Sequence, residues 1–153
     1  MDISDVTVRE LLPHEPPMVL LDRAVSFDEA TLCAEVDVHE GAMFCEARGI
    51  PAWVGIEYMA QAVAAHAGFE ARLQDEPPTI GYLLGTRSYQ ADVAHFPLHA
   101  RLRITVEALF VEMGLGAFAC RIEIDEPVAR ATINVYQPAG GVLEGIDSGR
   151  ISR

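Results

Sequence analysis

The stretch of sequence that decides the fold runs from Trp53 to Arg72 and reads WVGIEYMAQAVAAHAGFEAR. It contains no proline and only two glycines, and at a rise of ~1.5 Å per residue it would form a helix about 30 Å long. Its apolar residues cover nearly the whole circumference, and a helix that is apolar on every side belongs inside a protein. Pro51 precedes the stretch and Pro77 and Pro78 follow it, as start and stop signals. The sequence therefore predicts one long, buried central helix.

Strand patterns lie on both sides of this helix. Leu32–Val38 alternates apolar and polar residues, as a half-buried strand does. The other strand candidates are Met18–Phe27 before the helix and Ile80–Val93, Arg101–Glu112, Ala117–Ile124 and Val128–Tyr136 after it. Two strands, a buried helix and four further strands are typical of an α+β fold with an antiparallel sheet. We expect a single domain over residues 1–137, a flexible tail over 138–153, and a dimer, because one side of the helix still needs a partner or a ligand.

Composition excludes several classes of function. The chain has 153 residues and a net charge of -12, with 23 acidic residues against 11 basic ones, so it lacks the basic face that nucleic-acid binding requires. Three scattered cysteines indicate reduced thiols rather than a disulfide framework or a zinc site. The first residues do not form a signal peptide, and the apolar run Tyr58–Phe69 is too short to span a bilayer. We expect a cytoplasmic protein without membrane partner, metal or cofactor.

Glu57 is the candidate catalytic residue, because it is a carboxylate in the first turns of an apolar helix. Burial disfavours the charged form of a carboxyl group and suits it to proton transfer as an acid or a base. We expect Glu57 to be shielded from solvent beside an apolar slot. Gln61, one turn further on, lies on the same face and can hydrogen-bond to it. The alternative is a structural ion pair with Arg48 or Arg87.

The histidines offer no obvious partner for Glu57. His66 follows Glu57 by nine positions and falls on the opposite side of the helix, which predicts a hydrogen-bonded core histidine. The H-E-x-x-H motif of a helical zinc site does not occur. The remaining histidines fall in turns or at element ends, where solvated side chains are the expectation: His14, His39, His95 and His99.

Two motifs resemble those of the β-hydroxyacyl-acyl-carrier-protein dehydratases of the FabZ/FabA type. One is LLPHEPPMVLLDR at residues 11–23, and the other is PAWVGIEYMAQA at 51–62, which contains the E-x-M-A-Q core of the family in full. The order of elements also fits over residues 8–137. The sequence at 51–62 resembles even more closely that of the divergent dehydratase-like subunits found with aryl-polyene synthesis genes. The resemblance implies a hotdog fold, in which an antiparallel sheet wraps around the long helix and the chains pair into dimers.

The resemblance also implies roles for particular residues. A carboxyl at the position of Glu57 acts on the 3-hydroxyl leaving group, and a histidine from the other subunit removes the C2 proton. A backbone N–H at the helix start, that of Ala52 or a neighbour, polarises the thioester carbonyl, which stabilises the developing enolate. The residues expected to line the substrate site are Met43, Phe44, Ala52, Trp53 and Gln61.

The sequence departs from the family pattern at one decisive position. The family histidine lies fourteen residues before the carboxyl, inside H-F-P-G, and the corresponding residue here is Met43, at the start of MFCE. Methionine cannot abstract a proton. A chain of this sequence therefore lacks the usual acid–base pair, and a partner subunit of related fold could supply the histidine.

Three functional hypotheses follow. The first is a protein that binds a 3-hydroxyacyl thioester, on acyl carrier protein or coenzyme A, and aids its dehydration to the 2-enoyl form, as a homodimer or as a heterodimer with a related hotdog dehydratase. The second is a hotdog thioesterase that uses Glu57 as base or nucleophile and needs no histidine. The third is a non-catalytic subunit that stabilises an active dehydratase.

The negative charge of the chain bears on docking. Acyl carrier proteins are acidic as well, so long-range attraction is absent, and docking would need a local cluster of arginines. A guanidinium group suits the phosphate of phosphopantetheine. The candidates are Arg87, Arg101 and Arg103, together with Arg72; the alternative is a solvated strand face.

Overall fold

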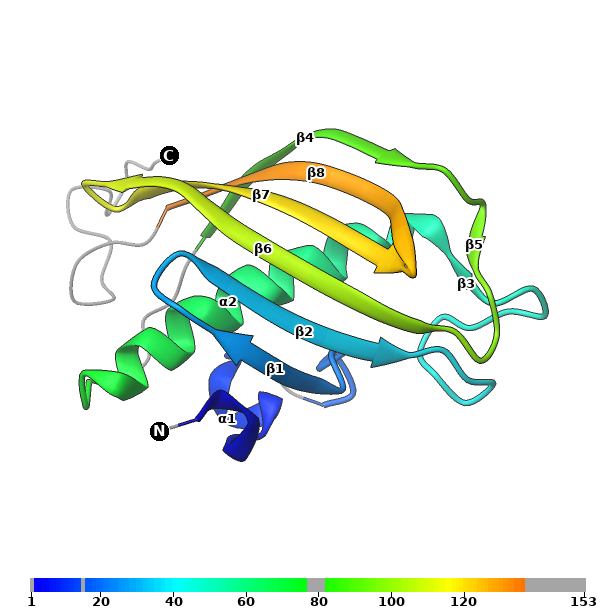
Figure 1. Cartoon of the computed structure of the whole chain (residues 1–153), viewed down its shortest axis with the longest axis horizontal. Coiled ribbons are helices and arrows are strands. Elements are labelled where there is room, and N and C mark those ends of the chain that lie inside the picture. Colours follow the sequence, from blue (N-terminus) through cyan, green and yellow to red (C-terminus); the bar gives the residue numbers. More distant parts are fainter. Residues whose placement is uncertain (1, 15, 77–81, 137–153) are drawn as a thin grey trace, which may run out of the picture.

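A long helix and a curved sheet make up most of the molecule. The computed structural model describes residues 2–14, 16–76 and 82–136. In Figure 1 the helix α2 (Gly55–Leu73) lies under an antiparallel six-stranded sheet that curves over it. The strand order is β1-β2-β6-β7-β8-β4. The strands are β1 (Arg23–Phe27), β2 (Thr31–Asp37), β4 (Tyr82–Ala91), β6 (Arg101–Glu112), β7 (Leu115–Ile124) and β8 (Glu126–Tyr136).

Shorter elements frame the two ends of α2. The 3-10 helix η1 (Ile3–Asp5) and the short helix α1 (Val8–Leu11) precede the sheet, and the 3-10 helix η2 (Ala52–Val54) leads directly into α2. The two-residue strands β3 (Ile50–Pro51) and β5 (His95–Phe96) pair with each other just before η2. A strand of two residues is too short to show an alternation of apolar and polar residues, so the sequence predicts neither strand. They fix the loop that enters the helix.

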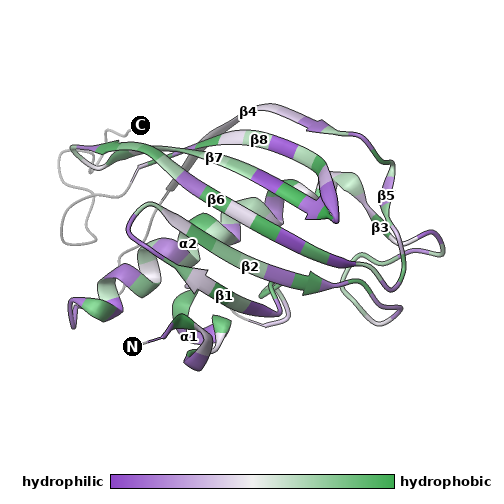
Figure 2. Cartoon of the chain, viewed as in Figure 1, coloured by the Kyte–Doolittle hydropathy of each residue, from purple (hydrophilic) through white to green (hydrophobic). Residues whose placement is uncertain are grey.

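The prediction of a buried central helix is confirmed over most of its length. Tyr58, Met59 and Phe69 on α2 are almost fully buried, and Figure 2 shows apolar stretches on the strands that run over the helix. On β6 the inward residues Leu102, Ile104 and Val106 are completely buried. The start of the helix differs, because Trp53 remains 60% exposed. The sheet therefore covers α2, whereas the 3-10 helix η2 that precedes it carries the exposed side chain of Trp53.

At Gly68 another segment of the chain lies directly against α2. A Cβ atom at this position would collide with the backbone carbonyl oxygen of Leu11, at the end of α1. The small residues Ala64 and Gly68 leave room, as their size suggests, for either a substrate or an opposing backbone. At Gly68 the occupant is the backbone of the N-terminal segment.

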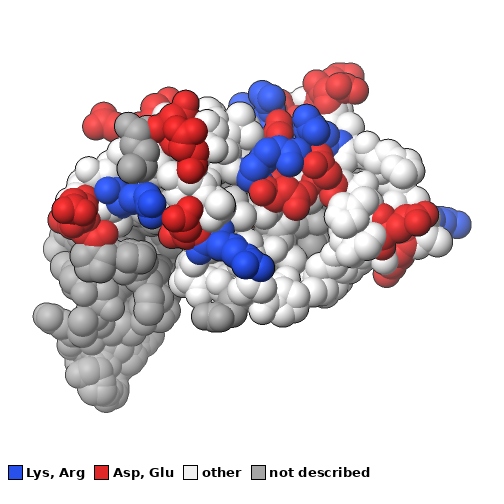
Figure 3. Space-filling model, turned by 90° about the horizontal axis from the view of Figure 1, so that it is seen from below, with Lys and Arg blue, Asp and Glu red and all other residues white. Residues whose placement is uncertain are grey.

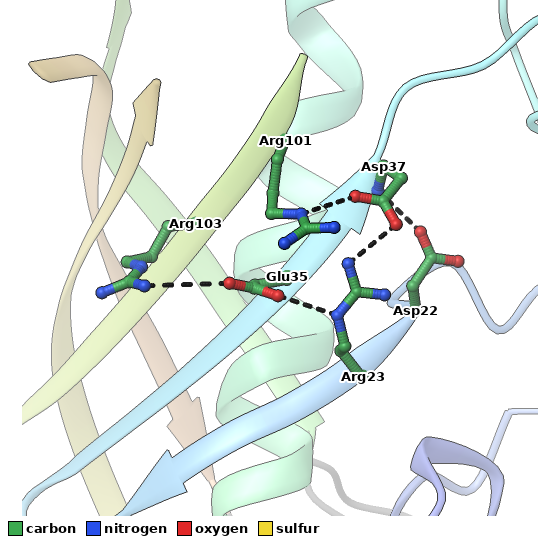
Figure 4. A network of polar contacts seen from close by, with 6 residues as sticks. All are labelled: Asp22, Arg23, Glu35, Asp37, Arg101 and Arg103. Carbon is green, nitrogen blue, oxygen red and sulfur yellow. Dashed lines mark hydrogen bonds and ion pairs between the residues drawn. The ribbon is translucent and has the colours of Figure 1, made fainter. Parts of the chain in front are cut away.

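The outer face of β2 is less exposed than simple alternation predicts. Cys33 and Glu35 point away from α2, yet both are buried. Arg23 from β1 and Arg103 from β6 flank the Glu35 carboxylate, with N–O distances of 2.7 and 3.8 Å. Paired charges on three neighbouring strands thus shield this part of the sheet (Figure 4).

The predicted element boundaries hold for the long strands and fail at residues 18–22. The expected strand Met18–Phe27 begins only at Arg23. The backbone carbonyl of Met18 and the backbone N–H of Leu20 are hydrogen-bonded to the side chain of Gln61 on α2 and not to a neighbouring strand. The predicted tail at 138–153 lies outside the described residues. None of the described helices is long and apolar enough to cross a membrane.

Candidate active site

Glu57 lies in the first turn of α2, and its carboxylate is held by Gln61. The side-chain nitrogen of Gln61 donates a hydrogen bond to Glu57 Oε2 at 3.0 Å. This confirms the expected contact one helical turn apart. The Glu57 side chain is 39% exposed, so the expectation of a carboxylate walled off from solvent is wrong for the single chain.

The orientation of Gln61 is fixed by the segment that precedes β1. Its side chain is completely buried. Its oxygen accepts the backbone N–H of Leu20 at 2.9 Å, and its nitrogen donates to the backbone carbonyl of Met18 at 2.7 Å. Because a backbone N–H can only donate and a carbonyl can only accept, the amide cannot be turned around. Gln61 must therefore present an N–H group to Glu57.

His14 is the third side chain of this group, beside Glu57 and Gln61. The sequence did not predict its place there. Its Nε2 lies 3.6 Å from Glu57 Oε2, and its side chain is 29% exposed. Its Nδ1 is buried and has no hydrogen-bond partner among the described residues. His14 was expected to be a solvated loop residue. Its contact joins residues 43 positions apart in the sequence, and such a contact leaves no local pattern.

No arginine pairs with Glu57 in the part of the chain that the structure describes. Arg48 is exposed and makes no ion pair there; the side chain of Arg87 lies outside the described residues. The structural ion pair considered as an alternative thus has no support at Arg48. The neighbours of Glu57 are instead an amide and an imidazole.

Phe44 and Trp53 come together near the start of α2. The rings of Phe44 and Trp53 meet edge to face, with centroids 5.4 Å apart. Phe44 adopts a left-handed backbone conformation with φ of 70°, which is uncommon for a bulky residue and typical of functional loops. Met43 and Phe44 both remain 36% exposed. Three of the predicted substrate-site residues are therefore exposed apolar side chains, and two of them are in ring contact.

A cavity of about 520 Å³ opens beside this group. Its lining combines apolar side chains, among them Met43 and Phe44, with the polar groups of Asp22, Asp37, His39 and Tyr58. Burial raises the pKa of the Tyr58 phenol, so this group stays protonated. Glu57 and Gln61 are not among the lining residues, and the cavity is not the purely apolar slot beside Glu57 that was expected. Within one chain the loop at 39–44 and the carboxylate occupy separate positions.

The backbone of Ala52 is already engaged. Its N–H donates to the carbonyl of Ala94 at 3.0 Å, and its carbonyl accepts the hydroxyl of Tyr89. The role that the family resemblance implied for the Ala52 N–H is therefore not available in this structure. The first N–H groups of a helix have no intrahelical partner, so the neighbouring N–H of Trp53 or Val54 is the candidate donor.

Three of the predicted docking arginines, Arg72, Arg101 and Arg103, are paired with carboxylates, and the side chain of Arg87 lies outside the described residues. Figure 4 shows Arg101 paired with Asp37, at 3.0 Å, and Arg103 paired with Glu35. The guanidinium of Arg23, and beyond it that of Arg101, holds the pKa of Asp37 below its usual value. Figure 3 shows that acidic side chains lie among the basic ones on this face, so that the arginines do not form a separate basic patch. Arg72 pairs with Glu10 at 3.5 Å.

His66 is a core histidine, as predicted. It is buried between the rings of Phe27 and Phe118, and its Nε2 lies 3.1 Å from the carbonyl oxygen of Glu29. The other histidines stay apart from Glu57. His95 pairs with Glu46, and the Nδ1 of His39 accepts the backbone N–H of Gly41.

The wrapped sheet, the central helix and a carboxylate in its first turn define a hotdog-fold protein of the 3-hydroxyacyl dehydratase superfamily. The chain belongs to the ApeP-like family, whose description is ApeP dehydratase and whose profile matches residues 6–145. This confirms both the predicted fold and the family resemblance.

Individual relatives agree with this membership. The chain is 32% identical over 141 residues to the 3-hydroxyacyl-[acyl-carrier-protein] dehydratase FabZ of Deinococcus radiodurans, covering 88% of this chain and 92% of that protein. Among solved structures, the dehydratase heterocomplex ApeI:P from Xenorhabdus doucetiae matches with a TM-score of 0.81 and 27% identity, over 88% of this chain and 93% of that one. The virulence protein Cj0977 of Campylobacter jejuni matches at a TM-score of 0.64 and 18% identity, over 92% and 93%, which shows the shared fold alone.

Proposed function

We propose that this protein binds a 3-hydroxyacyl thioester and takes part in removing water from it to give the 2-enoyl thioester. Glu57 is the residue that delivers a proton to the departing 3-hydroxyl group. The observation that carries the proposal is the fixed amide of Gln61, which holds a half-exposed carboxylate in the first turn of α2. Water leaves poorly without a proton, and a positioned carboxyl group supplies it.

The assembly that we propose is a pair of hotdog chains, either two copies of this chain or this chain with a related dehydratase. The exposed aromatic and apolar side chains Phe44 and Trp53 beside the helix start favour a partner at this surface. A solved dehydratase heterocomplex among the similar structures supports the mixed pair. Met43 gives a further reason for a mixed pair, because a related partner would contribute the histidine that this chain lacks.

The substrate carrier that we propose is acyl carrier protein or coenzyme A, both of which present the acyl group on a pantetheine thiol. The FabZ relative carries the acyl-carrier-protein substrate in its name. The three cysteines are free thiols, which supports a reducing compartment, and we place the protein in the cytoplasm.

The test is an assay of the purified chain, alone and with a FabZ-type partner, on 3-hydroxyacyl thioesters of both carriers. Enoyl absorbance and free thiol are followed together. We expect enoyl formation without thiol release, and Glu57→Gln should lower the rate by roughly 10²-fold or more, as loss of a positioned acid–base group does.

Glu70→Gln is the matched control, since it makes the same change at an exposed position of the same helix. It should leave the rate unchanged. Thiol release without enoyl formation would identify a thioesterase instead. An unchanged rate in the Glu57→Gln complex with an active partner would identify a non-catalytic subunit.

A further inference from the structure

The hydroxyl group of Tyr58 on α2 has no hydrogen-bond partner among the described residues, although Tyr58 is only 2% exposed. Within the same part of the chain, the one completely enclosed side-chain atom without a partner is Nδ1 of His14. The small exposed part of Tyr58 therefore includes its hydroxyl oxygen. Tyr58 lines the cavity of about 520 Å³ between the loop at 39–44 and the segment at 17–22, so the hydroxyl opens into this cavity.

Asp22 places a hydrogen-bond acceptor in the same cavity. One oxygen of its carboxylate accepts the backbone N–H of Asp37 at 2.7 Å (Figure 4). Asp37 is paired with Arg23 and Arg101, whereas Asp22 forms no ion pair with any residue that the structure describes. The second oxygen of Asp22 thus remains available. No direct hydrogen bond joins it to the Tyr58 hydroxyl, so a third group has room between the two.

The two groups define the chemistry of a ligand that would satisfy both. Burial, and after it the charge of Asp22, raises the pKa of the Tyr58 phenol, so this hydroxyl donates. A carboxylate accepts. The ligand must therefore accept a hydrogen bond on one side and donate one on the other, as a hydroxyl group or a secondary amide does. An ammonium group has no acceptor, and an anion would meet Asp22 and Asp37 with no arginine among the lining residues.

The rest of the cavity suits an uncharged molecule of small size. Its volume lies within the range of about 300–1,000 Å³ that is usual for small-molecule sites. Apart from its polar groups, the cavity is lined by apolar side chains: Pro17, Val19, Leu20, Val36, Ala42, Met43 and Phe44. A few polar groups among apolar walls are the usual composition of a ligand site.

We propose that this cavity binds an uncharged hydroxyl or secondary-amide group on an apolar stem, held between Tyr58 as donor and Asp22 as acceptor. The site contributes binding and no chemistry, and Glu57 is not among its lining residues. The choice of candidate ligands rests on the proposed function, because the pantetheine arm of a thioester substrate carries secondary amides and its 3-hydroxyacyl group carries a hydroxyl.

The experiment measures the binding of two probes to the full chain by NMR titration. S-methylpantetheine carries the amides alone, and ethyl 3-hydroxybutanoate carries the hydroxyl without an amide, so the two probes distinguish the sources. We expect one of them to bind, and Tyr58→Phe to raise its Kd by about tenfold, as loss of a hydrogen bond does.

Two further variants complete the test. Asp22→Asn keeps an oxygen for the Asp37 N–H but replaces the second acceptor by a donor, so it should weaken binding to a similar extent. Tyr136→Phe removes the same hydroxyl from a half-buried tyrosine at the end of β8 and should leave Kd unchanged. Tyr58→Phe deletes only a hydroxyl without a partner, so its melting temperature should not fall.

The other outcomes separate this inference from the proposed function. If neither probe binds, the Tyr58 hydroxyl is simply hydrated and the site is wrong. Binding that is unaffected by Tyr58→Phe and by Asp22→Asn places the probe elsewhere and also overturns the inference. Enoyl formation by a chain that binds neither probe leaves the proposed function standing without this site. Probe binding that depends on Tyr58, in a chain that forms no enoyl product with any partner, does the reverse.

Discussion

Gln61 is the side chain on which the geometry of Glu57 depends. It is completely buried and connects three backbone or side-chain groups: the Leu20 N–H, the Met18 carbonyl and the Glu57 carboxylate. Buried polar groups that lose a partner cost more than the lost hydrogen bond contributed. The residue thus has a structural task and a functional one.

Replacing Gln61 by Leu should therefore lower stability as well as activity. The substitution leaves the Leu20 N–H and the Met18 carbonyl without partners, at about 1–3 kcal/mol for each buried group. We expect the free energy of unfolding, measured by urea denaturation followed by circular dichroism, to fall by roughly 2–4 kcal/mol.

The exposed Gln90 on β4 provides the matched control. Gln90→Leu should change the free energy of unfolding by no more than about 0.5 kcal/mol, as surface substitutions do. Equal effects of the two variants would contradict the importance assigned to the hydrogen bonds of Gln61.

Among the elements, the contact between α1 and α2 depends on the absence of a side chain at Gly68. Gly68 allows the Leu11 carbonyl to lie against the helix. The same N-terminal segment continues to His14 and Met18, which contact the Glu57 site. The packing of α1 against α2 therefore determines where His14 lies.

Gly68→Ala should destabilise the protein although alanine is the better helix former. The added Cβ collides with backbone, which cannot rotate away, and overpacking of this kind costs about 1–3 kcal/mol. The gain in helix propensity offsets up to ~1 kcal/mol of this. We expect a lower melting temperature in differential scanning calorimetry.

Gly85→Ala on β4 is the control for this prediction, because nothing lies within 4 Å of a Cβ atom placed there. Its melting temperature should equal or exceed that of the unmodified protein. A Gly68→Ala variant that is as stable as Gly85→Ala would show that α1 moves aside easily, and the placement of His14 would then be loose.

For the whole molecule, Met43, Phe44 and Trp53 are exposed apolar side chains near the start of α2 that a partner chain would cover. Trp53 is 60% exposed beside the first turn of α2, and large aromatic side chains are enriched at protein interfaces. The proposed pairing of two hotdog chains would cover these side chains.

Trp53→Ser should weaken the assembly without unfolding the chain. Truncating a central aromatic residue of an interface commonly costs 2 kcal/mol or more, which is about a 30-fold higher dissociation constant. Analytical ultracentrifugation of the chain, alone and mixed with a related dehydratase, measures this change.

Met113→Ser is the control, because Met113 is 96% exposed at the turn between β6 and β7. It should leave the dissociation constant unchanged. An assembly that tolerates Trp53→Ser as well as Met113→Ser would place the interface elsewhere on the molecule.

Sequence alone predicted the central helix, the long strands, the family and the pairing of Glu57 with Gln61. These features rest on local periodicity or on short motifs, and the contact between Glu57 and Gln61 follows from the 3.6-residue turn of a helix. A pattern within a few residues of chain is sufficient for each of them.

Tertiary structure decided the rest. It placed His14 beside Glu57, turned residues 18–22 from a strand into partners for Gln61, and neutralised Arg101 and Arg103 with carboxylates on β2. It also left the side chains of Trp53 and Glu57, at the entrance to α2, partly exposed. Each of these outcomes depends on contacts between segments far apart along the chain, and such contacts are set by how helix and sheet pack, which no local pattern specifies.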